Sequence, residues 1–156
     1  EMLNEVKKTL PVDLVVCAAA VTDFKPSEKN KNKIKKDNMK LKYINLVKNN
    51  DILEYISKNN KDRPRLVAGF SAETENLIKN SINKLKRKHC DLIFANDVSQ
   101  KDIGFNSDYN EVSVIDKKGN VKMLPKNKKS FIANKIAEIL LDELLIDDRN
   151  INQKIN

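Results

Sequence analysis

The amino-acid sequence predicts an α/β fold in which a mostly parallel β-sheet carries helices on both of its faces. Short apolar runs of strand length alternate along the chain with longer segments whose apolar residues recur at helical spacing. The runs are continuously apolar, which is typical of parallel strands that are buried on both sides. Near the C-terminus, two strand-like runs flank residues 116–120, whose sequence indicates a β-hairpin turn. Together these features predict a Rossmann-like sheet followed by a C-terminal hairpin.

The order of the elements follows from the same periodicity. We expect, in chain order, a helix at 1–10, a strand at 13–20, a loop at 29–38, a strand at 39–47, a helix at 50–58, a strand at 65–71, a helix at 73–89, a strand at 91–95, hairpin strands at 111–115 and 121–124, and a helix at 130–145. The helix at 73–89 should bury Leu77, Ile78, Ser81, Ile82 and Leu85. The last helix should bury Phe131, Ile132, Ile136, Ile139, Leu140 and Leu144. We assign 1–146 to one domain and expect the polar tail at 147–156 to fray.

The composition narrows the class of protein. A chain of 156 residues with 40% hydrophobic content suits one globular domain with a substantial core. Its longest apolar runs are too short to cross a membrane, and its first residues lack the features of a signal peptide. Cys17 and Cys90 lie far apart within or beside apolar runs, so we expect reduced, packed thiols. These features predict a cytoplasmic protein that does not contact a membrane.

The charge points to an anionic partner. The formal net charge is +8, and a basic chain of this kind can bind nucleic acid. However, aromatic residues make up only 5% of the chain and tryptophan is absent, so platforms for stacking on bases are scarce. The basic residues are also spread along the chain. We therefore expect a nucleoside triphosphate as the anion, and no nucleic acid.

The end of the first predicted strand has features of a phosphate-handling site. Its small residues Ala18 and Ala19 let a ligand approach the backbone, and Asp23 follows at the carboxyl end, where open α/β sheets bind ligands. A lysine-rich segment that includes Lys33 comes next. By themselves, these residues leave two alternatives open, since Asp23 can be a turn residue and Lys33 a solvated loop lysine.

Further motifs follow in an order that resembles a known family. They are 49–53 (Asn-Asn-Asp-Ile-Leu), 69–75 (Gly-Phe-Ser-Ala-Glu-Thr-Glu), 95–99 (Ala-Asn-Asp-Val-Ser), 104–110 (Gly-Phe-Asn-Ser-Asp-Tyr-Asn), and the pair Lys84 and Lys88. With the strand-end motif, they resemble the phosphopantothenate–cysteine ligase domain of bacterial bifunctional coenzyme A biosynthesis proteins, over roughly residues 1–145. The chain has three glycines and no glycine-rich phosphate loop. The resemblance implies that such a unit would precede Glu1, and we expect that this chain lacks it.

The resemblance implies roles for particular residues. It places Lys33 at the transferring phosphoryl group as the catalytic residue, where its charge stabilises the transition state. The implied nucleotide contacts are Cys17, Ala18, Ala19, Asp23, Lys33, Asn50, Asp51, Ile52, Leu53, Phe70, Lys84 and Lys88. Asn96 is a candidate substrate contact. The metal ligands stay open, with Asp23 and Asp51 as candidates for magnesium.

Several of these positions also have a structural interpretation. Asn50 can cap the helix that follows it, and Phe70 can be a core residue. Lys84 and Lys88 can be solvated lysines that share one helix face. The family usually has proline where Asn50 stands, so we expect a less rigid helix start in this chain.

The resemblance also implies an activity. The family joins 4′-phosphopantothenate to cysteine with CTP and magnesium, through an acyl-cytidylate, in coenzyme A biosynthesis. It implies a homodimer to which the C-terminal hairpin contributes, and an FMN-containing decarboxylase domain that is not part of this chain. The segments 33–36 and 95–100 resemble bacterial members, which favours CTP over ATP. Two alternatives stay open: a non-catalytic nucleotide-binding or dimerisation fragment of such an enzyme, and a Rossmann-like oxidoreductase.

Overall fold

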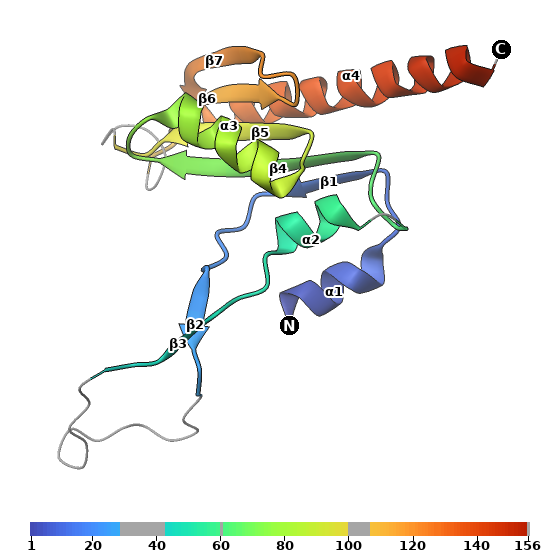
Figure 1. Ribbon diagram of the computed structural model, residues 1–156. Helices are drawn as coiled ribbons and strands as arrows, with labels where there is room; N and C mark the ends of the chain where they lie inside the picture. The colour runs from blue at the N-terminus through green and yellow to red at the C-terminus, as the bar shows by residue number, and fades with distance from the viewer. Residues whose placement is uncertain (29–42, 60, 100–106, 156) are drawn as a thin grey trace. The chain divides into compact units, whose positions relative to one another are not determined.

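The computed structural model describes residues 1–28, 43–59, 61–99 and 107–155, with residues 147–155 described by their backbone (Figure 1). The chain divides into two compact units. One contains residues 1–18 and 52–156, and the other contains residues 19–51.

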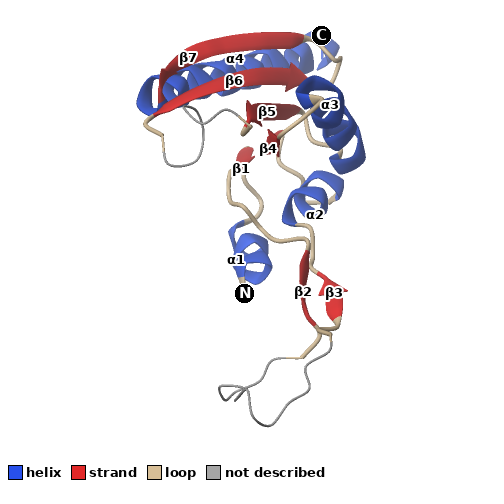
Figure 2. Ribbon diagram, turned by 90° about the vertical axis from the view of Figure 1, so that its left-hand side faces the viewer, coloured by secondary structure: helices blue, strands red, loops and turns tan. Residues whose placement is uncertain are grey.

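The larger unit is built on a mixed β-sheet. In the described residues, the strand order is β1 (Leu14–Cys17), β4 (Leu66–Glu73), β5 (Leu92–Asp97), β6 (Tyr109–Asp116) and β7 (Val121–Lys128). β1, β4 and β5 are parallel, whereas β6 and β7 form an antiparallel hairpin that pairs with β5. Figure 2 shows β1, β4 and β5 nearly end-on in this order. The predicted sheet with a C-terminal hairpin is confirmed.

Helices cover both faces of this sheet. α4 (Lys129–Ile155) packs on one face, whereas α1 (Met2–Thr9), α2 (Ile52–Lys58) and α3 (Leu77–Lys88) pack on the other. In β5, Phe94 belongs to the core on the side of α4 and Ile93 to the core on the opposite side, and both are fully buried. Because β5 is covered on both sides, its sequence is apolar at successive positions rather than at alternate ones.

The predicted helix stripes are largely confirmed. Every residue of the α3 stripe is buried or packs against the core, as are five of the six residues predicted on α4. The prediction for Phe131 is wrong, because its side chain is 46% exposed. It precedes the buried Ile132 by one position, and successive helix residues point about 100° apart. α4 continues to Ile155, so the backbone of the tail from Asp147 is helical.

Strand boundaries differ from the predictions in several strands: β4, β5, β6 and β7 extend past the expected residues, whereas β1 and β3 (Leu46–Lys48) are shorter than expected. β1 ends at Cys17, so Ala18 to Ala20 lie beyond the strand rather than inside it. β3 overlaps only the end of the strand expected at 39–47. Residues 39–42 of that strand and the whole loop expected at 29–38 lie outside the described residues.

The hairpin turn is held together by Asp116. Gly119 adopts a φ of +88°, which favours glycine, and its N–H donates to the Asp116 carbonyl at 2.9 Å. The Asp116 carboxylate accepts hydrogen bonds from the backbone N–H groups of Lys118 and Asn120 and from the Asn120 side chain. Partial burial opposes ionisation, but these hydrogen bonds outweigh it and lower the pKa of Asp116.

An ion-pair network closes the amino end of the parallel strands. Arg63 Nη2 contacts Asp91 Oδ2 at 2.9 Å, and the Val67 N–H donates to the same carboxylate oxygen at 2.8 Å. The Arg63 guanidinium also donates to the backbone carbonyls of Ser57, Pro64 and His89. This one side chain therefore connects the end of α2, the start of β4 and the end of α3.

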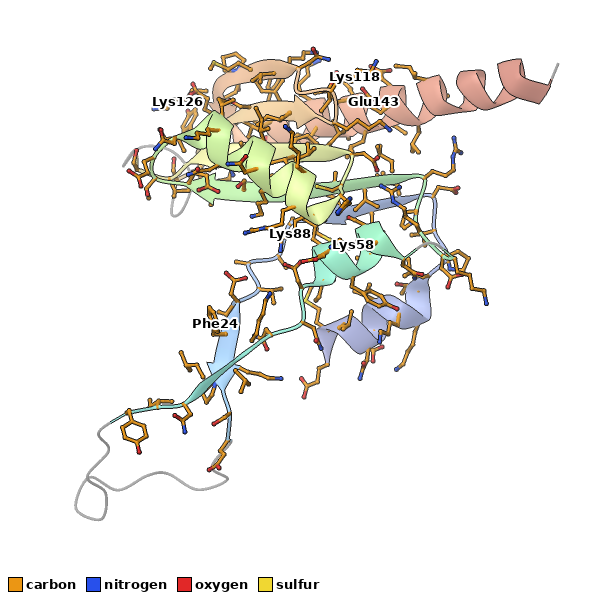
Figure 3. The ribbon with its side chains drawn as sticks, viewed as in Figure 1. Phe24, Lys58, Lys88, Lys118, Lys126 and Glu143 are labelled. Atoms are coloured by element: carbon orange, nitrogen blue, oxygen red, sulfur yellow. The ribbon has the colours of Figure 1, made fainter. Side chains whose placement is uncertain are left out.

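The smaller unit contains a short antiparallel ribbon. β2 (Phe24–Pro26) pairs with β3, with Phe24 opposite Lys48 and Pro26 opposite Leu46. Asn49 closes the ribbon, since its N–H donates to the Asp23 carbonyl at 2.7 Å and its side chain donates to the Thr22 carbonyl at 2.8 Å. Phe24 (Figure 3) and the other apolar side chains of the ribbon are exposed in this structure.

Candidate functional site

The strand-end motifs found in the sequence lie at one edge of the sheet. Cys17 of β1 is in register with Gly69 of β4, and Ala72 of β4 is in register with Asn96 of β5. Because these strands are parallel, their carboxyl ends face the same way, which is where α/β sheets bind ligands. The motifs at the ends of β1, β4 and β5 therefore lie on the same side of the sheet, beyond its parallel strands.

The first turn of α2 packs directly on β4 at Gly69. A Cβ atom at Gly69 would lie 2.6 Å from Leu53 Cδ2, so a larger residue at this position would require the Leu53 side chain to move. The Ile52 and Leu53 side chains are both buried in the core. Any contact that these two residues make with a ligand must therefore use their backbone groups. The contact with Gly69 fixes the start of α2 close to the end of β1.

Phe70 lies on the opposite face of the sheet. It is half-buried, packs against the core under α4, and has its ring 5.2 Å from the ring of Phe94. Leu53 and the helix α3 lie on the other face. The structure therefore gives Phe70 the core contacts of its structural interpretation and does not bring it together with Lys88. Its role as a nucleotide contact stays a prediction.

Lys84 and Lys88 differ in their surroundings. Lys84 is half-buried, whereas the Lys88 side chain is only 11% exposed and its Nζ lies 3.5 Å from Glu54 Oε2 on α2. Glu54 Oε1 also accepts a hydrogen bond from Lys58 Nζ at 2.6 Å. This bond, together with the charges of Lys58 and Lys88, outweighs desolvation and lowers the pKa of Glu54. Lys88 is therefore an ion-paired lysine at the junction of two helices.

Sequence reasoning missed Glu54. Its spacing of four residues from Lys58 was the available signal, because residues four apart share a helix face. The pairing with Lys88 joins helices that are separated by a strand, so no local pattern could reveal it.

Among the described residues, the side-chain oxygen of Asn96 has no hydrogen-bond donor, although it is buried. The same holds for Oδ1 of Asn110, which stands at the start of β6 beside a β-bulge in the hairpin. The antiparallel register of β5 and β6 brings the start of β6 to the carboxyl end of β5. Buried acceptors normally have partners, so both amides are candidates to receive a ligand's N–H or O–H group.

The neighbouring carboxylates already have donors within the protein. Glu73 Oε1 accepts from the buried Ser71 hydroxyl at 2.6 Å, and Glu73 Oε2 accepts from Asn80 Nδ2 at 3.3 Å. Asp97 Oδ1 accepts from both the backbone N–H and the hydroxyl of Ser99. These bonds hold the ends of β4 and β5 in place.

The remaining candidates lie in or beside the smaller unit. Ala19, Asp23 and Asn50 are exposed there, and Asp51 is half-buried. Ala18 is exposed at the end of the larger unit's first segment. The catalytic candidate Lys33 lies outside the described residues. Within the described ranges, no three His, Cys, Asp or Glu side chains come together in a way that could hold a metal ion.

Cys90 behaves as the packed thiol that the sequence predicted. It is buried in the core beneath α3, and burial raises the pKa of its thiol to about 12. Cys17 packs against the same core. In the part of the chain that the structure describes, no helix is both long and apolar enough to cross a membrane.

A mixed α/β sheet with helices on both faces, whose parallel strands end at one edge in polar side chains, has the architecture of the open α/β class. The chain belongs to the DNA/pantothenate metabolism flavoprotein C-terminal domain family, whose model matches residues 1–144.

Three known proteins illustrate this relationship. The coenzyme A biosynthesis bifunctional protein CoaBC of Borreliella burgdorferi is 41% identical over 142 residues, which are 90% of this chain and 35% of that protein. A cysteine/cysteine sulfinic acid decarboxylase from an unidentified prokaryote is 36% identical over 129 residues, which are 82% of this chain and 35% of that protein. The crystal structure of the C-terminal domain of a CoaBC protein superposes with a TM-score of 0.68 at 30% identity, covering 94% of this chain and 62% of that one. The chain thus spans about a third of the length of these curated relatives.

Proposed function

We propose that this chain is the larger part of a ligase domain that joins 4′-phosphopantothenate to cysteine with CTP, in cytoplasmic coenzyme A biosynthesis. Family membership and the names of the CoaBC relatives support this. The observation that carries the proposal is the parallel register of β1, β4 and β5, which gathers the three strand-end motifs at one edge. A decarboxylase name also occurs among the relatives. We place FMN and decarboxylation in the part of such proteins that this chain does not match.

In the proposed reaction, the carboxylate of 4′-phosphopantothenate attacks the α-phosphorus of CTP. The bond to the pyrophosphate leaving group breaks, and an acyl-cytidylate forms. The amine of cysteine then attacks the acyl carbon, CMP leaves, and a proton is lost from the new amide nitrogen. The protein positions the reactants and stabilises the developing charge, so no covalent enzyme intermediate is needed.

The residues would divide these tasks as follows. Lys33 would stabilise charge at the reacting phosphate, and Lys84 and Lys88 would attract the remaining phosphates. The open acceptor of Asn96 would receive a donor of the substrate. Magnesium commonly binds to nucleotide phosphates with one or two protein carboxylates, so the absence of a three-ligand cluster among the described residues is compatible with it. Asp23 and Asp51 remain the candidates for such a contact.

A nucleotide panel tests the proposal. We expect CTP with magnesium to raise the thermal midpoint of the chain more than ATP or GTP does, because a ligand that binds only the folded state stabilises it. NAD serves as the comparison for a Rossmann-like oxidoreductase. A flat response to CTP beside a clear response to NAD would overturn the ligase proposal.

The second candidate is a fragment that binds nucleotide without turnover. It is favoured by the finding that this chain covers 62% of the related CoaBC domain. Pyrophosphate release by the chain, measured with CTP and 4′-phosphopantothenate, separates the two. Binding of CTP without pyrophosphate release favours the fragment, whereas release at a sustained rate shows that the chain is a working ligase.

The expected homodimer is also a proposal. Val121 and Met123 on β7, an edge strand of the described sheet, are exposed, and an exposed apolar edge strand can pair with another chain. Light scattering of the chain at two concentrations tests it, with Met123→Lys expected to shift the equilibrium towards monomer.

A further inference from the structure

Three charged side chains form a cluster between α2 and α3, which we call the Glu54 cluster: Lys58, Glu54 and Lys88. Glu54 lies between the two lysines and contacts each through a different carboxylate oxygen. Figure 3 shows the labelled Lys58 and Lys88 beside α2. The cluster becomes more buried from Lys58 to Lys88, since their side chains are 48% and 11% exposed.

The burial of Lys88 requires a counter-charge. Lys86 and Arg87 precede it in the last turn of α3, and both are exposed to water. Lys88 instead points inward, where an ammonium group is costly unless an anion lies close to it. Glu54 supplies such an anion within the chain.

The two bonds of Glu54 are unequal. The contact from Lys58 is 2.6 Å, a short charge-assisted hydrogen bond within one helix, whereas the contact from Lys88 is 3.5 Å. Lys58 therefore holds the Glu54 carboxylate, and Lys88 is its weaker partner. If Lys88 turned to another anion, Glu54 would still be neutralised by Lys58.

The cluster borders the candidate site. Leu53, the residue before Glu54, packs on Gly69, and Gly69 is in register with Cys17 at the end of β1. Lys84 lies one helical turn before Lys88 on the same face of α3. An anion bound beside the end of β1 would therefore compete with Glu54 for Lys88.

We propose that Glu54 is the counter-ion of Lys88 in the free protein, and that a phosphate group of the bound nucleotide takes its place. The inference rests on the proposed function, because it requires a polyphosphate at this edge of the sheet. Glu54 then acts as a positioning residue. It keeps Lys88 charged and oriented without ligand, and it opposes the incoming phosphate through repulsion and through competition for Lys88.

Glu54→Gln provides the direct test, because glutamine keeps the size and can still accept a bond from Lys58. Binding of magnesium–CTP and of inorganic tripolyphosphate to the whole chain would be measured by calorimetry. We expect Glu54→Gln to bind both probes about three- to tenfold more tightly. In the absence of ligand, its thermal midpoint should fall, because Lys88 loses its counter-charge.

Matched controls separate this effect from general charge. Glu138→Gln changes the net charge equally and breaks a Lys135–Glu138 pair of 2.7 Å on the exposed surface of α4. It should alter affinity less than twofold. In a Lys88→Gln background, the gain from Glu54→Gln should disappear, since the two residues would no longer be coupled. A general packing role of Glu54 would produce no gain that depends on Lys88.

A variant of Lys58 provides a second test of the inference. This test can also be made if Glu54→Gln does not fold. Lys58→Gln removes the short bond that holds Glu54, so Glu54 competes more strongly for Lys88, and both probes should bind more weakly than they do to the matched Lys135→Gln variant. Lys135 belongs to the exposed α4 pair. Equal affinities for these two lysine variants would contradict the exchange.

The outcomes distinguish this inference from the proposed function. The inference is overturned if Glu54→Gln binds no better than Glu138→Gln, or if its gain persists without Lys88. If the wild-type chain binds CTP, neither of these two results contradicts the proposed function. If CTP does not bind while tripolyphosphate does, the proposed function fails and the tripolyphosphate measurements decide the inference. If neither probe binds to the wild type or to Glu54→Gln, the inference fails as well.

Discussion

The contact between Gly69 and Leu53 provides the sharpest test of how the sheet positions α2. Gly69→Ala would place a methyl group 2.6 Å from Leu53 Cδ2 and 3.3 Å from Ile93 Cδ1. The first distance is below any normal carbon–carbon contact, so the buried Leu53 side chain must move. Leu53 stands in the first turn of α2, and its displacement would therefore strain the start of that helix.

The size of the effect follows from the packing. Inserting a methyl group into a close-packed core typically costs about 1–3 kcal/mol. Leu53→Ala alone should cost about 2–5 kcal/mol, because it leaves a cavity. In that background the Gly69→Ala methyl group enters the vacated space, so its own cost should fall close to zero. The coupling free energy between the two sites is therefore expected to be about 1–3 kcal/mol.

Urea unfolding of the four members of this cycle measures the coupling. Gly119→Ala is the matched glycine control, because a Cβ at Gly119 meets nothing within 4 Å and the cost comes only from its φ of +88°. That substitution should destabilise by about 1–2 kcal/mol both with and without Leu53→Ala. The steric reasoning is refuted if Gly69→Ala costs the same in both backgrounds.

Three further predictions concern stability, ionisation and activity. Asp91→Ala should lower the free energy of unfolding by about 2–3 kcal/mol, because it removes both the Arg63 ion pair and the acceptor of the Val67 N–H; a loss below about 0.5 kcal/mol in urea unfolding would show that the network contributes little. Burial raises the pKa of the Cys90 thiol to about 12, so above about pH 9 the unfolded chain binds fewer protons than the folded chain. The free energy of unfolding therefore falls with rising pH, by up to about 1.4 kcal/mol per pH unit. Cys90→Ala should flatten this slope between pH 9 and about 11, and an unchanged slope would contradict the assignment. Lys33→Gln should lower product formation by on the order of a hundredfold while Lys35→Gln changes it little, and equal mild losses at both positions would remove Lys33 from the catalytic role.

The sequence was informative where a local pattern had one physical cause. The α3 stripe is an example, because the helical period alone decides which side chains face the core. The hairpin is another, since the turn around Asp116 and Gly119 joins two strands close in sequence. The pattern misled at Phe131, where an apolar residue beside the buried stripe of α4 is exposed. Apolar character alone does not show whether a residue next to a buried helix stripe is itself buried.

For the candidate site, the sequence determined which functional groups are present and in what order they follow one another along the chain. Small residues, carboxylates, amides and lysines follow strands whose buried character is readable from apolar runs, and a parallel sheet then brings those strand ends to one edge. Only the tertiary structure decided how the side chains are paired. It separated Phe70 from Lys88 by the thickness of the sheet, and it joined Glu54 on α2 to Lys88 on α3. Such pairings depend on which helices pack on which face and at what depth, and these are properties of the assembled core that no local segment contains.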